Sequence, residues 1–144
     1  MQNVSGVHVF LILLKAFRSV AAFASGTIED SNLGDSDFRV LEVLLHKGPM
    51  PVNTIGPKVF LTPGSISVAV DRLYEKGLVT RVDSKTDRRV RVVDLTPEGQ
   101  KLIKRVFNAH ANQLDELVKV LTKEEREQLV KTLKKLGKHA ERSL

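Results

Sequence analysis

The sequence of 144 residues contains no cysteine, and this absence removes several kinds of chemistry at once. Disulfides, thiolate metal sites, a cysteine nucleophile and thiol redox sensing are all excluded. The four histidines, at positions 8, 46, 110 and 139, lack metal-ligand spacings such as His-Glu-x-x-His. The sequence also lacks a glycine-rich phosphate loop and a nucleophile elbow around a serine. We therefore predict that the protein is not an enzyme and uses neither a metal nor a cofactor.

Long apolar runs are also scarce, and the most apolar one lies near the N-terminus at residues 7–14. No lysine or arginine precedes this run, whereas Lys15 and Arg18 follow it closely, which is not the pattern of a signal peptide. Its eight residues are fewer than the about 20 that a bilayer-spanning helix needs. We expect a buried helix face here and a cytoplasmic protein.

What the chain does contain is an excess of positive charge on an ordinary globular composition. The formal net charge is +6, with 42% apolar and 28% charged residues. The sequence pI is about 9.7. Such a balance favours polyanionic partners, nucleic acid first and anionic membrane second. The length fits one domain, or one domain with dimerisation arms.

Apolar spacing predicts three helices in the first 60 residues. Residues 4–25 carry apolar side chains three and four apart, and also around most of the helix, so this helix needs partners on most sides. After a loop at residues 26–34, a second helix begins with Asp35 or Ser36 as its cap and ends at Lys47-Gly48-Pro49. A third helix spans residues 51–59 and contains Pro57, so we expect it to be distorted or unusually short.

The remaining elements are marked by capping residues and by alternation. Thr62-Pro63 starts a helix over residues 62–76, and Ile66, Val70 and Leu73 form its apolar stripe. Residues 78–82 and 90–95 alternate apolar and polar side chains, which predicts a β-hairpin with a charged tip. A long helix follows from Thr96-Pro97 to about Val120. A capping box at residues 122–125 starts the final helix.

Residues 61–79, LTPGSISVAVDRLYEKGLV, resemble the recognition helix and first wing strand of the multiple-antibiotic-resistance regulator (MarR) family. Asp87-Arg88-Arg89 resembles the wing-tip motif of that family, and residues 95–99 resemble the entry to its long dimerisation helix. The resemblance runs from end to end and looks closest to the branch that responds to quinone-type and phenolic stress. It implies a mainly α-helical fold with a small β-hairpin wing, and a bacterial or archaeal protein associated with the nucleoid.

The resemblance also implies a division of labour along the chain. Residues 33–98 would form a winged helix-turn-helix that binds double-stranded DNA. Residues 4–25 and 99–144 would form the helical dimerisation part. These arms carry more apolar surface than one small domain covers, so we expect a homodimer with twofold symmetry. Its two recognition helices would meet major grooves about 34–36 Å apart, on a pseudo-palindromic operator. A bundle within one chain is the alternative.

Helix 62–76 suits the major groove, which is about 12 Å wide and admits one helix. Small residues opposite its apolar stripe allow close approach, Val68 could touch a thymine methyl, and Arg72 could reach a guanine edge or a phosphate. We expect Asp71 to pair with Arg72 or Lys76. The alternative is that helix 62–76 is an ordinary surface helix.

The basic hairpin tip suits the minor groove, and by resemblance Asp87 orients Arg89. Without the resemblance, the tip would be read as an ordinary solvated turn. The predicted DNA-binding residues are Thr62, Pro63, Gly64, Ser65, Ser67, Val68, Arg72, Arg81, Lys85, Asp87, Arg88 and Arg89.

The resemblance further implies a small aromatic, phenolic or quinone-like ligand in a cleft between the arms and the winged part. Such a ligand would release a repressor from its operator. Each candidate contact is also a plausible core or surface residue. The candidates are His8, Phe10, Phe17, Arg18, Phe38 and His46. Two other functions stay open: a non-specific architectural DNA-binding protein, and a membrane-surface protein that uses the basic C-terminal helix.

Overall fold

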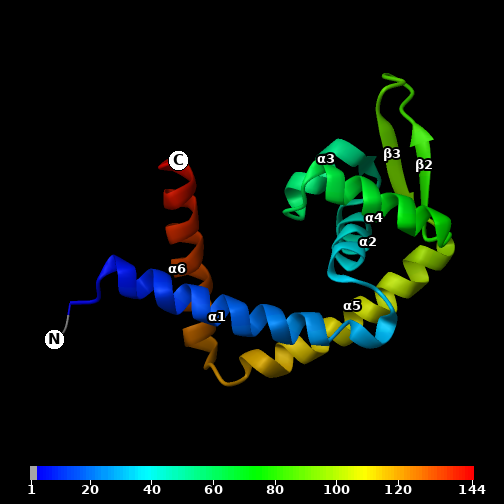
Figure 1. Cartoon of the computed structure of the whole chain (residues 1–144). Coiled ribbons are helices and arrows are strands. Elements are labelled where there is room, and N and C mark those ends of the chain that lie inside the picture. The colour runs from blue at the N-terminus through cyan, green and yellow to red at the C-terminus, as the bar shows by residue number, and fades with distance from the viewer. Residues whose placement is uncertain (1–2) are drawn as a thin grey trace. The chain divides into compact units, whose positions relative to one another are not determined.

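The computed structural model describes residues 3–144, which form six α-helices, a 3-10 turn and a three-stranded antiparallel sheet (Figure 1). Two compact units are present, one up to His110 and one from Ala111 to Leu144. The fold class is confirmed. In chain order the elements are α1 (Gly6–Gly26), η1 (Glu29–Ser31), α2 (Asp35–Lys47), β1 (Met50–Pro51), α3 (Val52–Lys58), α4 (Pro63–Glu75), β2 (Val79–Asp83), β3 (Arg91–Leu95), α5 (Pro97–Val118) and α6 (Lys123–Arg142).

The sheet has one strand more than the predicted hairpin. Strand β1 pairs with β3 through Met50↔Val93 and Pro51↔Val92, which gives the order β1-β3-β2. Two residues are too few to show an alternating pattern, and a proline suggests a turn. Pro51 is nevertheless tolerated because β1 is an edge strand, where one missing backbone donor is harmless. The hairpin itself runs Val79↔Leu95 to Asp83↔Arg91.

The start of α2 also differs from the prediction, whereas the length of α3 agrees with it. The N-cap of α2 is Gly34, which has no side chain to offer, rather than Asp35 or Ser36. Helix α3 covers only Val52–Lys58 and holds Pro57 in its last turn, which confirms that this helix is short. The turn η1 lies inside the predicted loop.

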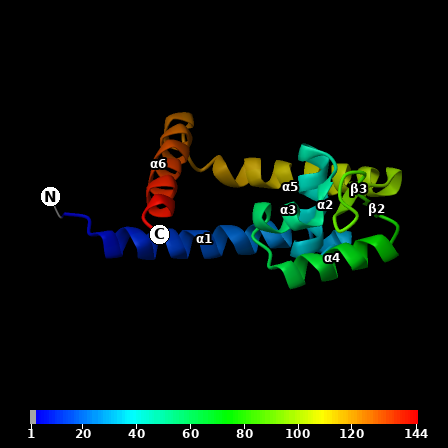
Figure 2. The same cartoon turned by 90° about the horizontal axis from the view of Figure 1, so that it is seen from above.

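The core lies where α2, α3, α4, the sheet and the first half of α5 meet. Its most enclosed large side chains come from five different elements: Leu41, Ile55, Leu73, Val93 and Ile103. The predicted stripe of Ile66, Val70 and Leu73 is buried, as expected. Figure 2 shows α2 between α4 and α5. Helix α4 therefore has one flank anchored in the core and the opposite flank in solvent.

A close backbone crossing joins the end of α4 to the start of α5. The Thr96 backbone N–H donates to the Leu78 carbonyl at 3.1 Å, and the Thr96 hydroxyl donates to the Gly77 carbonyl at 2.7 Å. Gly99 lies directly against this turn. A Cβ atom at position 99 would be 1.9 Å from the Leu78 carbonyl oxygen, so only glycine fits there.

Helix α1 corrects the expectation drawn from the eight-residue run. The helix has 21 residues, none of them buried within the chain. Its apolar character continues past the run, with a mean hydropathy of 1.8 over the most apolar part of Gly6–Ser31, so by length and composition alone it could cross a membrane. One polar stripe interrupts it: His8, Lys15 and Ser19 are seven and four apart, on the side opposite Phe10 and Phe17.

Candidate nucleic-acid interface

Helix α4 presents a flank of small side chains to solvent. The Thr62 hydroxyl caps the helix by accepting from the Ser65 backbone N–H at 3.2 Å, and Pro63 occupies the first turn. Ser65 and Ser67 are exposed, while Ile66 between them is buried. Pro63, Gly64 and Val68, the other residues predicted to lie opposite the apolar stripe, are exposed as well. We call this outward side of α4 its reading flank. The outward flank therefore has the size and polarity that close approach to base edges requires.

Arg72 is held by a buried carboxylate of α2. Its Nε atom donates to both oxygens of Asp37 at 3.0 and 3.1 Å, and Nη2 donates to Oδ1 at 2.7 Å. The Asp37 side chain is only 3% exposed, and Lys76 Nζ lies 4.0 Å from it. Hydrogen bonding to Asp37 and its negative charge raise the pKa of Arg72 above the ordinary value of an arginine. Arg72 thus fastens α4 to α2, and its contact with DNA stays a prediction.

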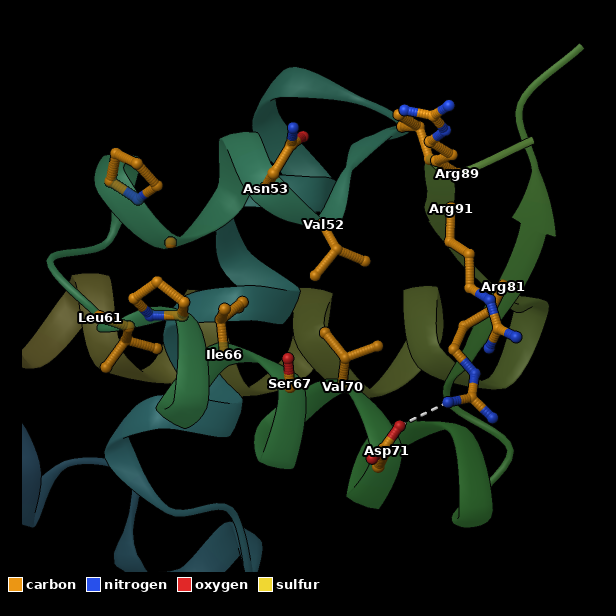
Figure 3. Close-up of a pocket in the computed structure, with 14 residues that line it drawn as sticks. Val52, Asn53, Leu61, Ile66, Ser67, Val70, Asp71, Arg81, Arg89 and Arg91 are labelled. Carbon is orange, nitrogen blue, oxygen red and sulfur yellow. Dashed lines mark hydrogen bonds and ion pairs between the residues drawn. The ribbon is translucent and has the colours of Figure 1, made fainter. Parts of the chain in front are cut away.

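Asp71 pairs with Arg81 of β2, so the expected pairing with Arg72 or Lys76 is wrong. The hairpin folds back beside α4, which brings Arg81 next to Asp71, and the bond is drawn in Figure 3. The Arg81 guanidinium also lies 4.0 Å from the centre of the Tyr74 ring, a cation–π contact. This triad fixes the base of the wing on the recognition helix.

The wing tip is a turn over residues 84–90 rather than a continuation of the strands. The Ser84 backbone N–H donates to the Val90 carbonyl at 2.7 Å and closes the turn. The Asp87 Oδ1 atom accepts from the Arg89 backbone N–H at 3.0 Å. Asp87 therefore meets Arg89 through the backbone of the turn and not across a regular strand. Asp87 shapes the backbone that carries Arg89, and Lys85, Arg88 and Arg89 are all exposed.

A cavity of about 570 Å³ lies between α3, α4 and the wing. In Figure 3, Arg81, Arg89 and Arg91 line its wing side, and Ser67 and Asp71 line its α4 side. The lining carries three guanidinium groups and one carboxylate, Asp71, which pairs with Arg81, and the remaining excess of positive charge suits phosphate. The further lining residues are Val52, Asn53, Gly56, Pro57, Leu61, Pro63, Ile66, Val70 and Val90.

A second cluster, of two phenylalanines and two histidines, joins α2 to α5. The rings of Phe38 and His110 are 4.9 Å apart, and those of His46 and Phe107 are 4.6 Å apart, both edge to face. The Thr27 hydroxyl donates its one proton to the Ala24 carbonyl at 2.6 Å. His110 Nδ1 lies 2.5 Å from the Thr27 hydroxyl oxygen, so Nδ1 must donate to that hydroxyl oxygen. This assigns the Nδ1–H tautomer to His110.

The predicted ligand residues separate into two groups. Phe38 and His46 belong to the cluster just described. His8, Phe10, Phe17 and Arg18 lie exposed along α1. Sequence reasoning missed Phe107 and His110, although a spacing of four from Ile103 to Phe107 and three to His110 places all three near one side of α5. Among residues 3–144, no group of three or more acidic or histidine side chains could hold a metal ion.

The stability of the protein is expected to fall in weak acid because of His110. Burial lowers the pKa of this histidine below 6.5, and the negative charge of Glu42 opposes the shift only in part. The unfolded chain therefore binds the proton at a higher pH than the native protein does. The stability that neutral His110 contributes is complete above about pH 6.5 and declines as the pH falls through the native pKa. Urea unfolding at about pH 7.5 and 5.5 should show that the free energy of unfolding falls less in His110→Gln than in the wild type. An equal fall in the two proteins would contradict this role of His110.

These features define a winged helix-turn-helix protein with a basic surface beside its recognition helix. The sequence pattern of the MarR family matches residues 33–90. The HTH-type transcriptional regulator MhqR of Bacillus subtilis (strain 168) is 39% identical over 134 residues, which cover 93% of this chain and 92% of MhqR. The chain therefore belongs to the MarR family: it is a DNA-binding transcriptional regulator and not an enzyme.

Solved structures agree with this assignment. The transcriptional regulator BldR from Sulfolobus solfataricus has a TM-score of 0.82 at 25% identity, over 96% of this chain and 99% of BldR. BpsR from Bordetella bronchiseptica has a TM-score of 0.79 at 25% identity, over 90% of this chain and 98% of BpsR. That structure concerns the regulation of BpsR DNA binding by 6-hydroxynicotinic acid.

Proposed function

We propose that the chain is a homodimeric, cytoplasmic repressor that binds a pseudo-palindromic operator and leaves it when an aromatic ligand binds. The observation that carries the proposal is the outward small-residue flank of α4, set beside the arginines of the wing. The helix would enter the major groove, and the wing would follow the minor groove. Phosphate contacts would supply much of the affinity, so binding should weaken steeply with salt.

Uncovered apolar surface supports the dimer. On α1, Phe10 and Phe17 are 61% and 67% exposed. On α6, Leu129, Val130, Leu133 and Leu136 are also exposed. A second copy with twofold symmetry would cover both helices, which assigns residues 4–25 and 99–144 to dimerisation and residues 33–98 to DNA reading. This pairing also explains a membrane-length apolar helix without placing it in a bilayer.

The ligand class rests on the relatives and on the two groups of aromatic residues. BpsR is regulated by an aromatic acid, 6-hydroxynicotinic acid. In this chain, Phe38 and His46 of the ring cluster, together with His8, Phe10, Phe17 and Arg18 of α1, offer aromatic surface, ring nitrogens and one cation. We assign to them a phenolic or quinone-like effector. An effector must bind the DNA-free conformation more tightly, because equal affinity for both conformations shifts nothing.

Selecting bound duplexes from a random pool, with and without phenolic acids and quinones, tests the whole proposal. The expected outcome is one pseudo-palindromic sequence that is enriched without ligand and lost with it. A ratio of specific to non-specific affinity near unity, at fixed salt, would instead favour an architectural DNA-binding protein. Enrichment that no such compound alters would remove the ligand class from the proposal.

Removing one wing arginine should weaken operator binding without altering the fold. Arg89→Ala is expected to cost about 1–3 kcal/mol of binding free energy, because an exposed guanidinium at the wing tip loses its DNA contact. Fluorescence anisotropy on the selected duplex measures this. Arg142→Ala, an exposed arginine on the side of α6 opposite Leu129 and Leu133, is the matched control and should leave the affinity unchanged. Equal affinities for Arg89→Ala and wild type would remove the wing tip from the interface.

A further inference from the structure

Phe60 combines two unusual properties in the turn between α3 and α4. Within residues 3–144, four residues adopt a clearly positive φ: Asn32 at 60°, Gly48 at 79°, Phe60 at 58° and Gly77 at 73°. Glycine and asparagine tolerate this left-handed conformation, whereas a larger side chain is crowded in it. The Phe60 side chain is also 91% exposed, so no packing within the chain compensates for the strain.

The hydrogen bonds around Phe60 show which residue the fold itself would favour. Val59 closes α3 through bonds from its backbone N–H to the Ile55 and Gly56 carbonyls, and the Leu61 N–H donates back to Gly56 at 2.9 Å. This last bond is the long bond of a Schellman motif, which places Phe60 at the position just past the helix end. Glycine is the usual residue there. The aromatic ring therefore serves something other than the fold.

The surroundings of Phe60 indicate what the ring contacts. Lys58 is exposed two residues before it, and Arg39 Nη1 donates to the neighbouring Val59 carbonyl at 3.3 Å. Thr62, the N-cap of the recognition helix, follows two residues later. The ring is thus flanked by cations and continuous with the α4 reading flank. A polyanion with apolar elements between its charges fits this setting, and the sugar–phosphate backbone of DNA has that chemistry.

We infer that Phe60 is a DNA-contact residue that packs on a deoxyribose of the backbone at the edge of the groove read by α4, with Lys58 and Arg39 at the adjoining phosphates. The inference rests on the proposed function. Such a contact positions the protein without reading sequence. Its loss should therefore weaken binding to operator and to random duplex by the same factor.

Three substitutions separate the ring from the backbone strain. Phe60→Tyr keeps the ring, Phe60→Ala removes the ring but keeps a Cβ atom, and Phe60→Gly removes both. Affinity for the duplex should follow the ring: near wild type for tyrosine, and weaker by about tenfold for alanine and for glycine, the scale of burying half an aromatic side chain. Thermal stability should follow the backbone, with a Tm higher by about 2–4 °C for Phe60→Gly alone.

Salt dependence and fluorescence give independent readouts. The slope of log Kd against log salt should be unchanged in Phe60→Ala but smaller by about one in Lys58→Gln, which loses a charge. The chain has no tryptophan, so Phe60→Trp introduces a single reporter. Its emission should shift to the blue on addition of duplex. Val120→Trp, at a residue 85% exposed on the other compact unit, should not shift.

The outcomes distinguish this inference from the proposed function. If the wild type binds its operator and Phe60→Ala and Phe60→Gly bind equally well, Phe60 is not a DNA contact. If only the affinity for operator falls and that for random duplex does not, the ring reads a base and the backbone contact is wrong. If the wild type binds no duplex, the proposed function itself fails.

Discussion

Gly99→Ala is expected to lower the free energy of unfolding by about 3 kcal/mol or more, and the Tm by about 10 °C. The added Cβ would be 1.9 Å from the Leu78 carbonyl oxygen and 2.9 Å from its carbon. These are backbone atoms, and the Thr96 N–H holds the same oxygen at 3.1 Å. Relief therefore requires the turn between α4 and β2 to separate from the start of α5, rather than a side chain to rotate.

Gly137→Ala is the matched control because it makes the same chemical change within a helix. Nothing lies within 4 Å of a Cβ at Gly137 in α6. The alanine should stabilise the protein by up to about 1 kcal/mol through its higher helix propensity. Thermal and urea unfolding followed by circular dichroism compare the two variants. A Gly99→Ala protein that melts with the wild type would mean that the crossing at Leu78 is looser than the structure has it.

Phe17→Glu is expected to weaken self-association at least about 100-fold, the scale of placing an unpaired charge in an apolar interface. Phe17 is 67% exposed on a helix with no buried residue in the single chain. If a second copy covers this face, the carboxylate would lose its water without gaining a partner. Sedimentation at micromolar concentration should show a dimer for the wild type and a monomer for the variant. Operator affinity should fall as well, because the two recognition helices would no longer be linked.

Ser19→Glu adds the same charge to the same helix and serves as the control. Ser19 lies with His8 and Lys15 on the polar stripe opposite Phe17. We expect its dimer to match that of the wild type. A wild type that sediments as a monomer would exclude the dimer outright. Equal association of Phe17→Glu and wild type would move the interface away from this face of α1.

Local chemistry made much of the fold predictable from sequence. Thr62 and Thr122 cap α4 and α6 as predicted, because a threonine hydroxyl satisfies a helix N–H within three residues of itself. Gly77 ends α4 for an equally local reason, its φ of 73°. The buried stripe of α4 follows from helical periodicity alone. The outward small-residue flank, which is central to the candidate site, was therefore predictable.

Contacts between distant residues were not predictable. Asp37 and Arg72 are 35 positions apart, and nothing near either residue in the sequence indicates the other. The same holds for Asp71 with Arg81, where a sequence neighbour seemed the natural partner but lies at a different angle around the helix. Strand β1 depends on pairing with β3, 40 residues later, rather than on its own composition. The conformation of Phe60 likewise depends on how α3 ends.

Two consecutive residues of α2 contact two different parts of the molecule. Asp37 accepts hydrogen bonds from Arg72 of the recognition helix, and Phe38 contacts the ring of His110 on α5. Both side chains leave the same turn of α2, so a ligand that displaced the rings would also act, through this helix, on the orientation of α4. Such a coupling would reach α4 from the side that is anchored in the core, without any contact on its exposed flank.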